Sequence, residues 1–205
     1  MKLSAITTTF TKYPRINIIL NNAKPINMNT KKMINALKIC SLAAFLFLAF
    51  GADAQAQKKE ERASPPKTSS ATVMGGEVTV AYSSPAKKDR VIFGELVPYG
   101  KVWRTGANEA TTITLESDMK IGGQLVEAGK YALFTVPGES SWEIILNKVW
   151  DQWGAYNYEA EQDVVRFSAT PVELKTPVEN FTIEVDESGK VEMKWDTTAV
   201  SFMVG

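Results

Sequence analysis

Aromatic and polar residues gather in a glycine-rich stretch of this 205-residue chain, from Pro98 to Ile113. The stretch reads PYGKVWRTGANEATTI and holds Trp103, Arg104, Asn108 and Glu109. A guanidinium supplies a two-pronged donor, while an amide and a carboxylate orient a polar ligand. We therefore predict a ligand-binding loop. In the structural alternative, Arg104 pairs with Glu109 or caps carbonyls of the loop, and Trp103 closes the end of the core.

A second stretch, Asn147–Asp163 (NKVWDQWGAYNYEAEQD), concentrates aromatic residues. It contains Trp150, Trp153, Tyr156 and Tyr158 beside amides and carboxylates. Such a mixture is typical of carbohydrate sites, because sugar C–H groups stack on rings while hydroxyl groups need polar partners. We predict that these four residues bind the same ligand as the first loop. The alternative is an aromatic loop that covers one open end of the fold, so that each tryptophan belongs to the core.

Carboxylates are the remaining candidates for acid–base chemistry. Glu109, Asp151 and Glu159 lie in the two loops. Two carboxylates at a suitable separation would permit glycoside hydrolysis. Separation along the chain does not give a distance in a β-fold, so this pattern alone names no catalytic residue.

Two residue types are missing where catalysis most often needs them. The chain has no histidine, and its one cysteine, Cys40, lies in the N-terminal part. Ser-His-Asp and Cys-His nucleophile systems are therefore excluded, as are zinc sites built on histidine or cysteine. We expect no cofactor. A metal ion would need oxygen ligands, and calcium is then the obvious candidate.

Charge is distributed unevenly along the chain. Residues 1–56 hold seven of the 23 Lys and Arg residues and one of the 23 Asp and Glu residues. From Gln57 onward there are thus 16 basic and 22 acidic residues, a net charge of −6. An acidic segment without a basic stripe argues against nucleic acid or an anionic membrane surface as the partner.

Strand-like alternation of apolar and polar residues begins after Gly76. It recurs in Glu77–Tyr82, Thr112–Leu115, Tyr131–Val136, Trp142–Asn147, Val165–Ala169, Phe181–Asp186, Val191–Trp195 and Val200–Val204. Gly122-Gly123 and Asp186–Gly189 are hairpin signals. The pattern predicts a single all-β domain, an antiparallel β-sandwich resembling a jelly roll, with a β-barrel as the alternative.

The N-terminal part reads as an export signal. The apolar run Leu42–Phe50 follows lysines and precedes Ala54-Gln55-Ala56, which fits the small-x-small cleavage rule. We predict an over-extended start in 1–27, with a natural start at Met28 or Met33. The signal peptide is then 28–56, a disordered tether 57–74 and the sandwich domain 75–205. Such a protein is exported to the periplasm or secreted, with no stable membrane anchor after cleavage.

Three motifs in this order resemble the domain-of-unknown-function 2911 family of exported bacterial proteins. They are Tyr99–Thr111, Ala128–Gly138 and Trp153–Tyr158, and the resemblance covers roughly Gly75 to Val204. It implies a β-rich periplasmic or secreted domain and no particular reaction. Since the signature lies in loops, it favours a functional role for Trp103–Glu109.

Three functions remain open from the sequence. The first is a non-catalytic binding module for a polar ligand, which is a glycan, a peptide or a small molecule. The second is a carboxylate-dependent hydrolase that acts on carbohydrates. The third is an envelope protein with a structural or interaction role. The absence of histidine- and cysteine-based catalytic systems places binding ahead of catalysis.

Overall fold

The computed structural model describes residues 62–205. The predicted start site, the signal peptide and the first residues of the predicted tether lie outside this range. Within it the chain forms ten strands and one short 3₁₀-helix, η1 (Ala160–Gln162). The strands are β1 (Pro66–Val73), β2 (Gly76–Ser83), β3 (Thr112–Leu115), β4 (Met119–Ile121), β5 (Gln124–Val126), β6 (Gly129–Val136), β7 (Trp142–Asn147), β8 (Asp163–Ala169), β9 (Val172–Val185) and β10 (Lys190–Met203).

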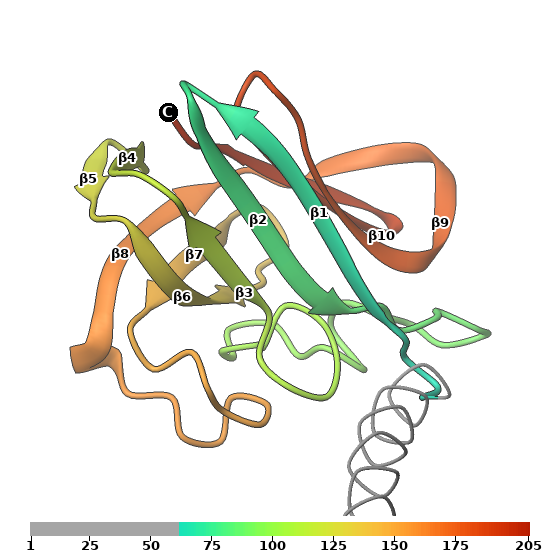
Figure 1. Ribbon diagram of the computed structural model, residues 1–205. Coiled ribbons are helices and arrows are strands. Elements are labelled where there is room, and N and C mark those ends of the chain that lie inside the picture. Colours follow the sequence, from blue (N-terminus) through green and yellow to red (C-terminus); the bar gives the residue numbers. More distant parts are fainter. Residues whose placement is uncertain (1–61) are drawn as a thin grey trace, which may run out of the picture. The chain divides into compact units, whose positions relative to one another are not determined.

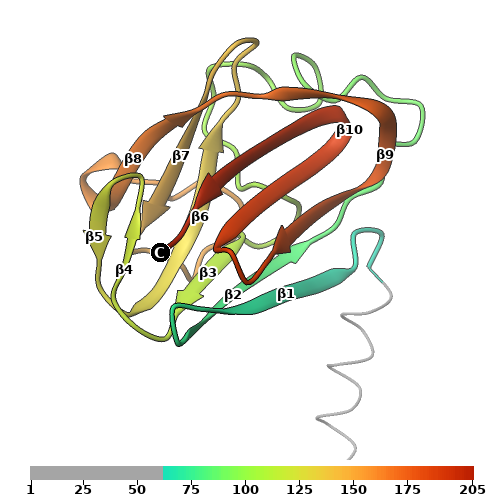
Figure 2. The same ribbon diagram turned by 90° about the horizontal axis from the view of Figure 1, so that it is seen from above.

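Six of these strands form one antiparallel sheet in the order β1-β2-β3-β6-β7-β8 (Figure 1). The long hairpin β9–β10 is a second layer that curls across this sheet (Figure 2). A third, small hairpin, β4–β5, closes one end, and its Ile121 pairs with Val204 just after β10. In the large sheet β1 and β8 each have one neighbour, so the sheet is open. The predicted all-β antiparallel sandwich is confirmed, and the barrel alternative is wrong.

The main core lies between the large sheet and the β9–β10 hairpin. Alternate residues of the sheet point into it, such as Val78 and Val80 of β2 and Ile144 and Leu146 of β7, all fully buried. The hairpin contributes Trp195 and its neighbours from the other side. Burial of alternate residues explains why the period-two pattern predicted the strands, because successive side chains of a strand point to opposite faces.

The two hairpin turns that the sequence predicted are present in the structure. Gly122 and Gly123 join β4 to β5, and both have positive φ angles of 60° and 84°. A Cβ atom at Gly122 would lie 2.3 Å from the ring of Phe167, so this position requires glycine for packing as well as for conformation. The predicted Asp186–Gly189 turn joins β9 to β10.

The predicted tether is wrong over its second half. Pro66–Val73 forms β1, which pairs in antiparallel register with β2 from Pro66↔Ser83 to Val73↔Gly76. Its polar composition suggested disorder, but an edge strand with one face in solvent needs few apolar residues. Within residues 62–205, no helix has the length and apolarity that a membrane crossing requires.

Candidate ligand-binding site

The two predicted loops lie side by side at one end of the large sheet (Figure 1). Ala110 N–H donates to the carbonyl of Gln152 at 3.0 Å, and Gly154 N–H donates to the carbonyl of Asn108 at 3.0 Å. Between these two bonds, Glu109 and Trp153 form an isolated antiparallel bridge. Residues more than forty positions apart thus form one continuous surface.

Close packing explains a glycine of the first loop, which also holds two residues in the left-handed conformation. A Cβ atom at Gly106 would lie 2.9 Å from the carbonyl oxygen of Ser83, so the loop can approach β2 only with glycine there. Thr105 and Asn108 have φ angles of 53° and 59°. The buried Thr105 hydroxyl donates to that of Thr135 at 3.1 Å, which holds the loop against β6.

A buried amide anchors the second loop. The Asn147 side chain donates to the Glu159 carbonyl and to Asp163 Oδ1, both at 2.9 Å. Its Oδ1 accepts from Val149 N–H at 2.9 Å. This single fully buried side chain therefore holds both ends of the loop that carries the exposed aromatic residues.

The second loop also covers part of the outer face of the sheet. Tyr158 packs against Phe134 of β6, with ring centroids 5.2 Å apart. Together with Ala155 they belong to a small apolar cluster around Ala132 and Ile145. This cluster explains why residues of both faces of β6 are buried, as the sequence of that strand indicated.

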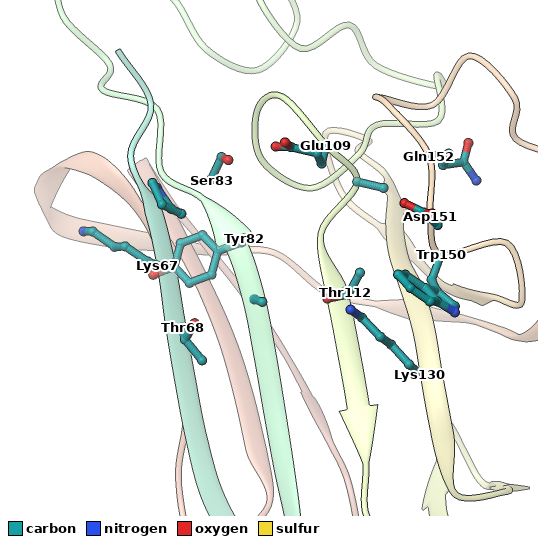
Figure 3. A pocket seen from close by; sticks show the side chains of 13 residues that line it. Lys67, Thr68, Tyr82, Ser83, Glu109, Thr112, Lys130, Trp150, Asp151 and Gln152 are labelled. Atoms are coloured by element: carbon teal, nitrogen blue, oxygen red, sulfur yellow. The ribbon is translucent and has the colours of Figure 1, made fainter. Parts of the chain in front are cut away.

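A groove of about 300 Å³ runs over the outer face of the sheet beside the loops (Figure 3). Its floor consists of strand residues and its wall of loop residues. The lining residues are Pro66, Lys67, Thr68, Ala81, Tyr82, Ser83, Glu109, Ala110, Thr112, Lys130, Trp150, Asp151 and Gln152. Of the eight predicted site residues, Glu109 and Trp150 line this groove.

The groove carries both signs of charge next to an aromatic face. Lys130 Nζ lies 4.0 Å from the centre of the Trp150 ring, and Figure 3 shows the two side chains next to each other. Glu109 and Asp151 supply carboxylates from the loops. Such a lining can donate and accept hydrogen bonds and can stack on an apolar ligand face.

Glu109 also meets the chain that leads into β1. Its two carboxylate oxygens accept from Arg62 Nη1 at 2.7 and 2.8 Å. The Arg62 guanidinium carbon lies 6.0 Å from the centre of the Trp153 ring. Asn108 Nδ2 donates to the Ser64 carbonyl at 3.2 Å. Three predicted site residues therefore contact the protein's own residues 62–64.

Trp103 lies in the core, as the structural alternative predicted. Its ring stacks on Trp195 at 6.0 Å and meets Phe181 edge-on at 5.2 Å. Its indole N–H donates to the Gly106 carbonyl at 3.1 Å. Because Trp103 pairs with Thr135 of β6, its side chain follows the inner face of the sheet.

The Arg104 side chain points away from Trp103, to the opposite face of the sheet. The predicted ion pair with Glu109 is not formed, and no carboxylate within residues 62–205 pairs with Arg104. Its Nε is buried without a hydrogen-bond partner. A Cβ atom at Gly154 would lie 2.8 Å from Arg104 Nη1 and 3.1 Å from the Tyr156 ring. The guanidinium thus lies directly against the backbone of the aromatic loop.

The loop aromatic residues differ in exposure. Tyr156 is 82% exposed, Trp153 54% and Trp150 39%. Tyr158 is half-buried, and its hydroxyl donates to Asp163 Oδ2 at 2.7 Å. Burial raises the pKa of Tyr158 to about 12, helped by the bond to Asp163 and opposed by Arg166. Trp150, Trp153 and Tyr156 therefore keep part of their rings exposed to solvent, whereas Tyr158 holds the loop to the sheet.

Some residues that line the groove were not predicted from the sequence. Lys67 lies in the segment that was predicted to be a tether, and Thr112 and Lys130 occupy outward positions of β3 and β6. A polar residue on an outward strand position has the same sequence signal whether or not a loop folds over it. Within the described part of the chain, no group of three acidic side chains is placed to hold a metal ion.

Comparison with protein families adds an identification. A family model described as "Protein of unknown function (DUF2911)" matches residues 64–204. Comparison with the curated proteins and with the solved structures gives no match. The match begins just before β1, which agrees with the structure on where the domain starts. The chain belongs to the DUF2911 family.

Proposed function

We propose that this chain is a non-catalytic binding module for a polar ligand, and that it works in the periplasm or outside the cell. The observation that carries the proposal is the groove of Figure 3, where exposed Trp150 stands beside Lys130, Glu109 and Asp151. A ligand-sized hollow with one aromatic face and a few convergent polar groups is the usual design of a binding site.

The lining favours a ligand that has both apolar faces and hydrogen-bonding groups. Trp150 provides a stacking surface and Lys130 three N–H donors. The hydroxyl groups of Ser83 and Thr112 donate and accept from the floor. Glycans, peptides and small polar molecules meet this description, and an exported location would expose the groove to all three.

Thermal-shift screening of the full chain against glycans, peptides and calcium tests this proposal. A ligand that binds the native state raises the unfolding midpoint by mass action. We expect Trp150→Ala to weaken a groove ligand by about two- to tenfold, since stacking of this kind is worth about 0.5–1.5 kcal/mol. Leu125→Ala, a change at an exposed apolar residue on β5, is the matched control. A ligand whose affinity is the same in both variants does not use the groove.

A carbohydrate hydrolase is the second candidate, because Glu109 and Asp151 line the same groove. The mechanism needs one carboxyl group that protonates the leaving oxygen. Both Glu109 oxygens accept hydrogen bonds from Arg62, whereas that role needs a carboxyl group that donates. Chromogenic aryl glycosides provide the test. Turnover that disappears in Glu109→Gln and in Asp151→Asn would replace binding by catalysis as the function.

A further inference from the structure

The segment that precedes β1 lies on the candidate site in the manner of a bound peptide. Arg62 Nη1 donates to both oxygens of Glu109, and the Ser64 carbonyl accepts from Asn108 Nδ2. The Pro65 carbonyl accepts from Ser84 N–H at 2.9 Å, which continues the pairing of β1 with β2. One side chain and two successive carbonyls of this segment thus form hydrogen bonds with polar groups of the domain.

The surroundings of the Arg62 side chain have the composition of a guanidinium site. A carboxylate binds the N–H groups, and the Trp153 ring lies 6.0 Å from the guanidinium carbon. Carboxylates and tryptophan faces are the two partners that a guanidinium prefers in proteins. Both groups keep access to solvent, since the Glu109 side chain is 42% exposed and Trp153 54%.

We propose that Asn108, Glu109 and Trp153 form a binding site for an arginine residue of an extended peptide, and that Arg62 occupies this site in cis. The inference rests on the proposed binding function and names its ligand class. Glu109 and Trp150 line the same groove, so an arginine in this site would lie at the border of that groove. The net charge of −6 from Gln57 onward favours encounter with a basic peptide.

Arg62 then acts as a built-in competitor. A tethered side chain has an effective concentration in the millimolar range, so an incoming arginine must displace it. If Arg62 fills nine-tenths of the sites, the apparent affinity for a peptide falls about tenfold. Removal of the Arg62 side chain is therefore expected to strengthen binding, which distinguishes a competitor from a residue that supports the site.

The test uses N-acetyl-arginine amide as the probe and the full chain as the receptor, with binding followed by Trp fluorescence and calorimetry. We expect Arg62→Ala to bind the probe at least about tenfold more tightly than the wild-type protein. The double variant Arg62→Ala/Glu109→Gln should lose this binding. Equal affinity of the wild-type protein and Arg62→Ala, or binding that survives Glu109→Gln, would overturn the proposal.

Matched probes and variants separate the guanidinium site from general charge effects. N-acetyl-citrulline amide has nearly the same shape without the charge and should not bind, while the lysine analogue should bind more weakly because its ammonium is a point charge. Equal binding of citrulline and arginine would contradict the proposal. Arg90→Ala is the control variant, since the Arg90 side chain donates to the carbonyls of Lys87 and Ala86 and lines no part of the groove described above. Its affinity for the probe should equal that of the wild-type protein.

Further variants separate a loss of folding from a loss of binding. If Arg62→Ala lowers the unfolding midpoint, Arg62→Gln replaces it, because glutamine has no charge and keeps two of the three methylene groups. Trp153→Phe should retain more affinity than Trp153→Ala if the ring face takes part in binding. Failure of the arginine probe together with a Trp150-dependent groove ligand would refute only this inference. Failure of both would also refute the proposed function.

Discussion

The two faces of the large sheet both carry tryptophan, but they expose it to very different degrees. On the inner face Trp103, Trp142 and Trp195 pack with Phe93 and Phe181. Trp195 there is 2% exposed. On the outer face, the loop between β7 and β8 leaves Trp153 54% exposed. The same residue type therefore occupies two different environments, and its position relative to the strands decides which.

The physical difference lies in what supports each set. The inner rings come from three strands and the connection between β2 and β3, and they touch one another with edge and stacked contacts of 4.9 to 6.4 Å. The outer rings depend on backbone bridges and on the buried amide of Asn147. Apolar burial stabilises the first set, whereas hydrogen bonds position the second and leave its ring faces available.

The largest expected loss of stability follows from a substitution in the inner set of tryptophans. Trp195→Ala should lower the free energy of unfolding by about 3–5 kcal/mol, because it removes a fully buried ring and leaves a cavity among Trp103 and Phe181. Urea unfolding followed by circular dichroism measures the change. A loss below about 1 kcal/mol would show that these rings do not form the core.

The second-largest loss of stability is expected at Asn147, which anchors the loop that carries the outer tryptophans. Asn147→Ala removes the amide that bonds Glu159, Asp163 and Val149, and leaves their polar groups unsatisfied. We expect a loss of about 2–3 kcal/mol, together with greater quenching of tryptophan fluorescence by acrylamide as the loop loosens. Asn157→Ala, an exposed amide of the same loop, is the control and should change neither quantity.

Two of the three inner tryptophans could be predicted well from the sequence. Trp142 and Trp195 stand in strands of clear period two, so their direction follows from that of their apolar neighbours. Strand β1 could not be predicted in this way. Of its eight residues only Val73 is fully buried, and its place in the fold comes from backbone pairing with β2. Backbone pairing leaves no mark on side-chain composition.

The outer site could be predicted as two loops that share one ligand, but the contacts that join the loops could not. Their contact depends on the bridge between Glu109 and Trp153, which the spacing along the chain does not encode. Trp103 and Arg104 show a second limit, because adjacent residues of one glycine-rich loop point to opposite faces. The direction of each became clear only from the pairing of Trp103 with Thr135. The contact of Arg62 with Glu109 had no sequence signal at all.

A smaller effect is expected from the tyrosine that joins the loop to the sheet. The pKa of Tyr158 is raised from 10.0 to about 12 in the folded protein. Between these pH values the unfolded chain loses the proton and the folded protein keeps it, so the free energy of unfolding falls as the pH rises. Tyr158→Phe should make this fall shallower in urea unfolding at about pH 9 and about pH 11. Tyr156→Phe, at an exposed position, is the control, and an identical slope in all three proteins would contradict the assignment.

The smallest effect on stability should come from the exposed tryptophan, although the chemical change is the same as in the core. Trp153→Ala removes a ring that is half in solvent and lies beside the Arg62 guanidinium, so we expect a loss of at most about 0.5 kcal/mol. The pair Trp195→Ala and Trp153→Ala thus compares the two faces directly. If Trp153→Ala costs as much as Trp195→Ala, the loop tryptophan is a structural residue, and its exposure gives no support to a binding role. If the protein remains as stable as the wild type while a ligand is lost, the exposed face is retained for recognition.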